Sequence, residues 1–149
     1  MEIKLNLGCG NDYKEDYENA DISRDVKADL YFDVTKGIPR PDNTYDEVLA
    51  NNVLTQIEKN IDFVCVINEL WRVTKPKGYI LIRVPLATHP CAFQDSMDCR
   101  RFTDQSFTYM DINHRRYEQY GKHYGYKPFK TELIENNGIQ MIFKLIPKK

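Results

Sequence analysis

The feature of this sequence that most constrains its fold is a short alternating stretch that runs directly into a glycine turn. Ile3 to Leu7 alternates apolar and polar residues, and the next five residues are Gly8-Cys9-Gly10-Asn11-Asp12. Alternation predicts a β-strand, and the glycines permit a tight turn that a ligand can approach without meeting a Cβ. We therefore expect a strand followed by a ligand-binding loop.

The following residues predict further strands and one clear helix. The helix covers Ile61 to Thr74, with apolar or small residues at helical spacing that we expect to face the core: Val64, Ile67, Leu70, Trp71 and Thr74. Strands are expected over Tyr17–Ile22, Ala28–Asp33, Tyr45–Ala50 and Tyr79–Val84. Strands that alternate with helices favour an α/β fold with a mostly parallel sheet.

The last third of the chain has a different pattern. Pro85 to about Arg101 is irregular, and Thr103 is expected to open a helix. Asn136-Asn137-Gly138 then separates two apolar runs, and Asn-Gly between such runs is a strong hairpin signal. We expect the chain to end in an antiparallel pair of strands.

The glycine turn does not fit a dinucleotide site. Such a site needs a third glycine where this chain has Tyr13, and a helix whose N-terminus faces the pyrophosphate. Ten residues separate Gly10 from Asp21, which leaves no room for that helix. NAD is therefore not expected as the cofactor.

A nucleoside without a pyrophosphate needs less. It requires the glycine turn, an acid after the second strand for the ribose hydroxyls, and a polar group after the third strand for the base. Asp21 and Asp33 stand at these two strand ends. Each alone is equally well explained as a surface or capping aspartate, but their order after the glycine turn favours a site.

Several ordered motifs resemble those of the S-adenosylmethionine-dependent methyltransferases, in particular the short class I type of bacteria and phages. They are Leu5-Asn6-Leu7-Gly8-Cys9-Gly10-Asn11, Asn19-Ala20-Asp21-Ile22, Asp33-Val34-Thr35, Pro41-Asp42-Asn43-Thr44-Tyr45-Asp46-Glu47, and the segment from Glu69 to Tyr79. The resemblance covers roughly residues 3 to 110. It implies a Rossmann-like, seven-stranded, mostly parallel sheet with an antiparallel C-terminal hairpin and a reduced helix layer.

The resemblance also implies S-adenosylmethionine as the cofactor and a set of residues that would bind it. The glycine loop would lie against the methionine part, Asp21 would bind the ribose, and Asp33 and Val34 would bind the adenine. The full set of expected cofactor residues is Leu7, Gly8, Cys9, Gly10, Asp21, Ile22, Asp33, Val34 and Asn51. The chain departs from the family at Asn6, Asp12, Asn52 and Gln56, and the last two replace frequent histidines.

The acceptor side is less specified. The irregular segment after Tyr79–Val84 is expected to overhang the site, so the candidate substrate-binding residues are Asn52, His89, Asp95 and Arg100. A solvated loop histidine is the favoured reading of His89, and Arg100 with Arg101 is also explained as a solvated pair. The Asn/Asp-Pro-Pro-Tyr motif of amino-directed methyltransferases is absent, and no catalytic residue is assigned.

A segment rich in tyrosine and basic residues covers residues 114–126. Stacking on RNA is one interpretation, but a lid or packing segment is favoured, because the 149-residue chain carries a net charge of −1. This balance gives no general attraction to nucleic acid or to anionic membranes. The four cysteines form no CxxC pair, so reduced thiols and no metal site are expected.

These patterns together predict one methyltransferase domain over residues 1–149, soluble and cytoplasmic, acting on a small-molecule substrate. The expected reaction is methyl transfer to a small or sugar-like acceptor. The alternative is an S-adenosylmethionine-binding partner or regulatory subunit without catalysis. The sequence names neither the acceptor nor the oligomeric state.

Overall fold

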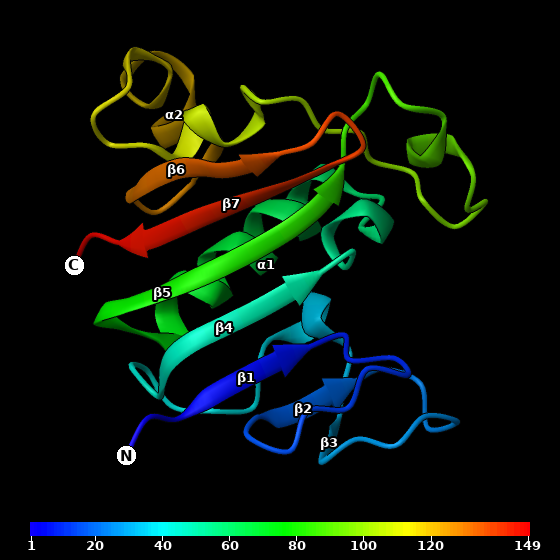
Figure 1. Ribbon diagram of the computed structural model, residues 1–149. Helices are drawn as coiled ribbons and strands as arrows, with labels where there is room; N and C mark the ends of the chain where they lie inside the picture. The colour runs from blue at the N-terminus through cyan, green and yellow to red at the C-terminus, as the bar shows by residue number, and fades with distance from the viewer.

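One seven-stranded sheet organises the computed structural model, which describes residues 1–149. The strands lie in the order β3-β2-β1-β4-β5-β7-β6, and all neighbours up to β5 are parallel, whereas β7 is antiparallel to β5 and β6 (Figure 1). Their bounds are β1 Lys4–Leu7, β2 Glu18–Asp21, β3 Leu30–Tyr31, β4 Tyr45–Asn51, β5 Thr74–Pro85, β6 Phe129–Asn136 and β7 Gln140–Pro147. The predicted mixed sheet and its C-terminal hairpin are confirmed.

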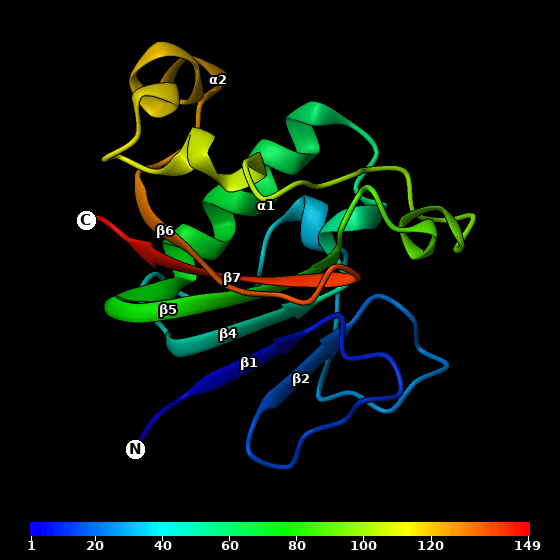
Figure 2. The ribbon, with the colours of Figure 1, turned by 45° about the horizontal axis from the view of Figure 1, so that its top comes forward.

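A single long helix, α1 (Asn60–Val73), covers one face of the sheet along β4 and β5 (Figure 2). Its buried residues are Phe63, Val66, Ile67, Leu70 and Val73. The predicted stripe is therefore partly wrong. Ile67 and Leu70 belong to both sets and Thr74, the first residue of β5, is also buried, whereas Val64 and Trp71 are only half-buried. Trp71 lies at the edge of the contact, where its indole N–H donates to the carbonyl of Pro128 at 2.9 Å. The helix is apolar on so many sides that several rotations fit the sequence pattern, and contact with the sheet selects one.

No helix covers the opposite face of the sheet (Figures 1 and 2). The chain between β1 and β2 is instead held by two buried amides, Asn6 and Asn19, which are 2% and 0% exposed. The Asn19 side chain accepts from the Lys14 N–H at 2.9 Å and donates to the carbonyls of Lys14 and Tyr17 at 2.8 and 2.9 Å. Asn6 donates to the Asn19 oxygen at 3.0 Å and to the carbonyl of Asp12 at 2.8 Å. These bonds fix the loop that a helix would otherwise hold in place.

The remaining helical segments are short turns. They are η1 (Val34–Lys36), η2 (Leu54–Gln56), η3 (Pro90–Phe93), η4 (Ser106–Met110), the π-helical turn η5 (Tyr117–Gly121) and α2 (Lys122–Tyr124). The helix expected to open at Thr103 is absent. Its backbone N–H donates to the Ser106 hydroxyl at 2.8 Å, and its own hydroxyl accepts from the Gln105 N–H at 3.2 Å. Such local side-chain bonds compete with a continuous helix.

None of the helices combines the length and the apolar character that crossing a membrane would require.

The buried amide network generates a stability prediction. Asn19→Leu keeps the approximate shape of the side chain but leaves the backbone groups of Lys14 and Tyr17 without partners. Unsatisfied buried polar groups cost about 1–3 kcal/mol each, so we expect a loss of about 2–5 kcal/mol in urea unfolding. Asn11→Leu, at an exposed position of the same loop, is the matched control and is expected to change stability by less than about 0.5 kcal/mol. Equal losses in the two variants would contradict a structural role for the amides.

Candidate functional site

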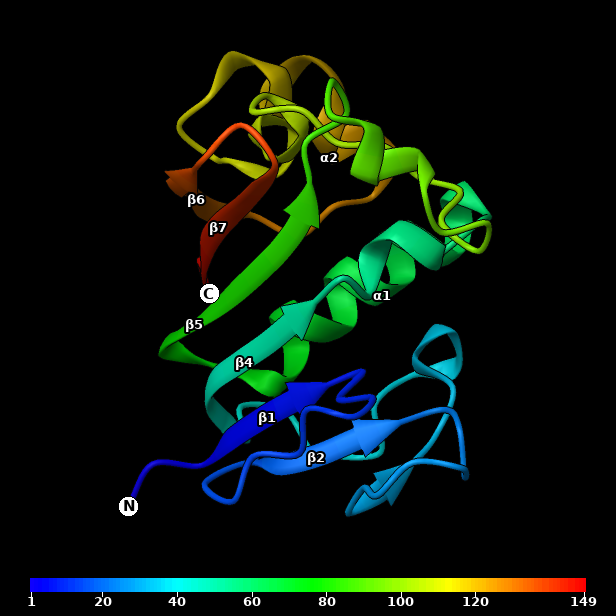
Figure 3. The ribbon, with the colours of Figure 1, turned by 45° about the vertical axis from the view of Figure 1, so that its right-hand side comes forward.

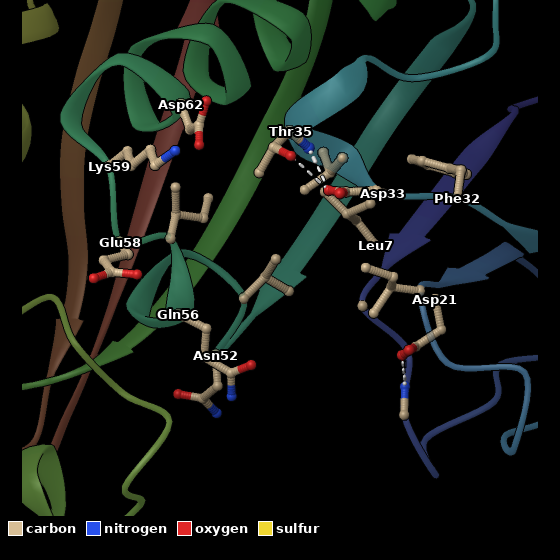
Figure 4. Close-up of a pocket in the computed structure, with 16 residues that line it drawn as sticks. Leu7, Asp21, Phe32, Asp33, Thr35, Asn52, Gln56, Glu58, Lys59 and Asp62 are labelled. Atoms are coloured by element: carbon tan, nitrogen blue, oxygen red, sulfur yellow. Dashed lines mark hydrogen bonds between the residues drawn. The ribbon is translucent and has the colours of Figure 1, made fainter.

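In Figure 3 the arrows of β1, β2 and β4 point toward the same edge of the sheet. A pocket of about 530 Å³ lies beyond the carboxyl ends of the parallel strands (Figure 4). Its size falls in the range typical of small-molecule sites. Loops after β1, β2, β3 and β4 and the start of α1 supply its lining: Leu7, Gly8, Gly10, Asp21, Ile22, Phe32, Asp33, Val34, Thr35, Asn52, Val53, Gln56, Ile57, Glu58, Lys59 and Asp62. The edge of an open parallel sheet is where such folds bind ligands.

The glycine turn brings the β1 loop into close contact with the β4 loop. Gly8 has φ +65°, and a Cβ on it would lie 2.4 Å from a methyl carbon of Val53. Gly10 has φ +50°, but a Cβ there would meet nothing within 4 Å. Both positions therefore need the left-handed backbone that glycine adopts freely, and Gly8 also needs the absence of a side chain.

Asp21 closes the glycine loop onto the end of β2. One carboxylate oxygen accepts from the Gly10 N–H at 2.8 Å (Figure 4), and the other accepts from the Ser23 N–H at 2.9 Å. Each oxygen keeps a further lone pair, so a hydroxyl of a ligand in the pocket can still donate to it. Asp21 thus lines the pocket and also accepts hydrogen bonds from the backbone of the loops beside it.

Asp33 caps the first turn after β3 and also faces the pocket. Its Oδ1 accepts from the Thr35 N–H at 3.0 Å and from the Thr35 hydroxyl at 2.7 Å, while Oδ2 has no protein partner (Figure 4). The hydroxyl bond is the main reason that the pKa of Asp33 lies below its ordinary value. Oδ2 therefore remains free to accept a hydrogen bond from a ligand in the pocket.

The end of β4 contributes a strained residue. Asn52 has φ +57°, and its backbone N–H donates to the carbonyl of Arg83 at 2.9 Å. Non-glycine residues are uncommon in this conformation, although asparagine tolerates it better than most, and such residues cluster at functional sites. The backbone path places the Asn52 side chain in the pocket, close to Gln56 (Figure 4).

The pocket is acidic. Four carboxyl side chains line it, and Lys59 is the one lysine or arginine among the lining residues. A ligand with positive charge is favoured in such a cavity, whereas a pyrophosphate is repelled. S-adenosylmethionine carries a sulfonium and an ammonium group, so the carboxylates of this pocket suit this cofactor and disfavour NAD.

The structure does not bring all the expected site residues to the pocket. The Cys9 side chain is buried away from it, with its thiol directed to the carbonyl of Lys27, and Asn51 is not among the lining residues. His89 caps η3 through Nδ1, which accepts from the Cys91 N–H at 3.1 Å. Asp95 accepts from the Met97 N–H at 2.9 Å in a local turn. Neither residue lines the pocket.

The expected position of the Pro85–Arg101 segment over the pocket is not observed, since none of its residues lines the cavity. Arg100 instead donates through Nε to the carbonyl of Ile57 at 3.0 Å and stacks on the Phe63 ring at 4.2 Å. It therefore anchors the segment to the start of α1.

Eight lining residues were not predicted as site residues: Phe32, Thr35, Val53, Gln56, Ile57, Glu58, Lys59 and Asp62. Most belong to the segment between β4 and α1. The rule that ligands lie beyond the strand ends could have pointed to this segment, but how far along it the cavity extends depends on the path of the loop.

Comparisons with known proteins support the fold and the family. Residues 10–82 match the family described as "Methyltransferase domain". An S-adenosylmethionine-dependent methyltransferase from Archaeoglobus fulgidus superposes with a TM-score of 0.64 at 15% identity, covering 99% of this chain and 86% of the other. No curated protein matches the sequence significantly.

Two further solved structures share the fold. A chain from the Haloferax volcanii complex between the Trm112 methyltransferase activator and a methyltransferase has a TM-score of 0.63 at 14% identity, covering 99% of this chain and 83% of the other. DhpI, solved as a complex with SAM and HEP, has a TM-score of 0.66 at 14% identity, covering 97% and 78%. At these identities the structural likeness establishes the fold.

The contact between Gly8 and Val53 generates a second prediction. Gly8→Ala and Gly10→Ala both place an alanine in a left-handed conformation, at a cost of about 1–2 kcal/mol each. Gly8→Ala must also displace Val53, which adds about 1–3 kcal/mol of overpacking. We expect Gly8→Ala to be the less stable variant in urea unfolding without ligand. Equal stability of the two variants would show that the β1 and β4 loops are not in contact.

The bond between Thr35 and Asp33 generates a pH prediction. Thr35→Val removes the hydroxyl donor, so the pKa of Asp33 should rise toward its ordinary value of 3.8 in an NMR titration. A lowered folded-state pKa stabilises the fold above the unfolded pKa, and this contribution is lost as pH falls through the folded value. The stability difference between wild type and Thr35→Val should therefore be full at pH 7 and shrink below about pH 4. Thr44→Val, whose hydroxyl donates to the carbonyl of Pro41, is the control and should leave the Asp33 pKa unchanged.

Proposed function

We propose that this chain, which belongs to the class I S-adenosylmethionine-dependent methyltransferases, transfers the methyl group to a small, hydroxylated, sugar-like acceptor. The observation that carries the proposal is the acidic pocket at the strand ends, which also contains the amide side chains of Asn52 and Gln56. The lining residues outside the proposed cofactor position include the polar side chains of Asn52, Gln56 and Lys59, which favours a polar acceptor over a lipid or a flat aromatic one.

The cofactor would occupy the part of the pocket between the glycine loop and η1. The Asp21 carboxylate would accept from the ribose hydroxyls and the free Asp33 oxygen would accept from the adenine amine. Ile22, which is 68% exposed, and Val34 offer apolar surface to the ring. The glycine loop, with no side chain at Gly8, leaves room for the methionine part.

The acceptor would bind beside Asn52 and Gln56, which lie together at one end of the pocket (Figure 4). A primary amide offers both a donor NH2 group and an acceptor oxygen. It can therefore bind a hydroxyl group, which also donates and accepts hydrogen bonds. When bound, S-adenosylmethionine supplies a methyl group that is already activated on its sulfonium. The protein would then align the acceptor oxygen with that methyl group. The new carbon–oxygen bond would form as the carbon–sulfur bond breaks, with S-adenosylhomocysteine as the leaving group and the hydroxyl proton passing to solvent. Alignment alone supplies a large part of a rate enhancement.

Asp33→Asn tests the cofactor site with little effect on the fold. Asparagine is also a good helix cap, so Oδ1 can still accept from Thr35, but the group facing the pocket changes from an acceptor to a donor. Hydrogen bonds to charged groups contribute about 1.5–3 kcal/mol, so S-adenosylmethionine affinity should fall about 10- to 150-fold in calorimetry. The exposed Asp16→Asn controls for the lost charge and should retain wild-type affinity. NAD binding comparable to that of S-adenosylmethionine would overturn the assignment of the pocket.

Turnover distinguishes the proposed reaction from the alternative of a non-catalytic binding subunit. The protein is incubated with S-adenosylmethionine labelled on the methyl group and with a panel of mono- and oligosaccharides, and release of S-adenosylhomocysteine is measured. Transfer to a saccharide that Gln56→Leu abolishes, with cofactor affinity retained, is the expected result. Tight cofactor binding without transfer to any saccharide in the panel would contradict the proposed acceptor class.

A further inference from the structure

A second pocket, of about 290 Å³, lies away from the first and shares no residue with it. We call it the tyrosine pocket, and it is lined by Tyr109, Arg115, Arg116, Gln119, Tyr120 and Tyr124. Its residues come from η4, η5, α2 and the turn before η5. These elements lie over the β6 side of the sheet, whereas the first pocket lies beyond the ends of β1 and β4 (Figure 1).

Three tyrosine rings form an exposed aromatic surface in this pocket. The centroids of Tyr109, Tyr120 and Tyr124 lie 6.1 to 6.4 Å from one another. The Tyr124 ring is tilted by only 24° from Tyr109 and 22° from Tyr120. Tyr120 and Tyr124 are 47% and 56% exposed, so their faces are accessible to a ligand.

The local backbone is built for this close approach. A Cβ on the buried Gly121 would lie 1.7 Å from the carbonyl oxygen of Tyr109, so only glycine lets η5 pack against η4. The turn itself, Tyr117–Gly121, is π-helical, and such turns are rare and occur often at functional sites. Both features bring Tyr109 and Tyr120 together.

The segment is also anchored to the rest of the protein. Asn68 on α1 donates to the carbonyl of Gly125 at 2.8 Å and accepts from the Lys127 N–H at 2.8 Å. Tyr126 packs edge-on against both Tyr124 and the core residue Phe63. The aromatic surface is therefore held in place before any ligand arrives.

Two arginines at the pocket have no acidic partner. Arg116 is positioned by Gln105 and Thr108, at 2.8 and 3.1 Å, and its guanidinium lies 5.6 Å from the Tyr109 ring centre. Arg115 is exposed and makes neither a side-chain hydrogen bond nor an ion pair. The one acid of η5, Glu118, is paired with Lys122.

From this arrangement we infer that the tyrosine pocket binds a nucleotide unit, with the base stacked on the exposed tyrosines and the phosphate held by Arg115. Aromatic faces stack on any base, and unpaired guanidinium groups are suited to phosphate. The near-neutral charge of the whole chain does not oppose this, because residues 112–130 alone carry five lysines and arginines against one glutamate. The inference does not depend on the identity of the methyl acceptor.

The same three rings could be taken for an aromatic cage that binds a quaternary ammonium. Cages of that kind attract a cation to the ring faces. Two unpaired arginines beside the rings would repel such a ligand, and no free carboxylate of η5 compensates for them. The charge of the pocket therefore favours an anionic aromatic ligand.

The test is a titration of the full chain, without S-adenosylmethionine, against a fluorescently labelled single-stranded oligonucleotide of mixed sequence, followed by anisotropy. Alanine substitutions of stacking residues in comparable sites weaken binding about 5- to 150-fold, so Tyr120→Ala and Tyr124→Ala should each fall in this range. Arg115→Glu should weaken binding and reduce its dependence on salt. Arg24→Glu, an exposed arginine in the loop between β2 and β3, makes the same charge change away from the pocket and should bind like wild type.

Competition with unlabelled mononucleotide distinguishes a site for free nucleotides from a site for a nucleic acid strand. Displacement at equal nucleotide concentration indicates a site for free nucleotides, and failure to displace indicates a strand; both support the inference. Absence of binding by either probe overturns it, as does wild-type affinity in all three pocket variants. Preferential binding of a trimethyllysine peptide would also overturn it. The melting temperatures of the variants, which alter exposed side chains only, verify that each is folded.

Discussion

The buried pair Asn6 and Asn19 is the interaction on which the rest of the site depends. Seven strands with a single long helix leave one face of the sheet without a helical layer, and the segment between β1 and β2 has no regular structure of its own. Its backbone groups still need partners where they are buried. The two amides provide these partners, and the glycine loop that follows β1 keeps one shape as a result.

The pocket combines this fixed loop with a particular charge. The Asp21 carboxylate holds Gly10 while it faces the cavity, and Asp33 caps η1 with one oxygen while the other remains free. Because the site uses acids both to shape the loops and to face the ligand, it suits a cationic cofactor.

Sequence reasoning succeeded where the signal is local. The hairpin at Asn137-Gly138, the strand before Gly8 and the order of the acids after the strands all follow from patterns a few residues long. It failed where competing local patterns fit equally well. Helix α1 offers apolar residues on several sides, so Trp71 was placed on the buried stripe although it lies at its edge. The segment containing Arg100 was expected over the pocket. Its guanidinium instead donates to the carbonyl of Ile57 and stacks on the Phe63 ring, contacts that the sequence pattern does not reveal.

By itself the sequence determined the fold class and the strand ends that carry the acidic residues, because strand patterns and turn residues act through neighbours along the chain. The type of cofactor followed from the resemblance of its ordered motifs to those of the methyltransferases. Tertiary structure decided which side chains share a cavity. Gln56 and Asp62 enter the pocket, and Cys9 leaves it, through the paths of loops that are set by distant contacts. The tyrosine pocket is a further case, since Tyr109 and Tyr120 are eleven residues apart and meet only because Gly121 allows two turns to touch. Side-chain type follows from the sequence, but proximity between loops is a property of the packed fold.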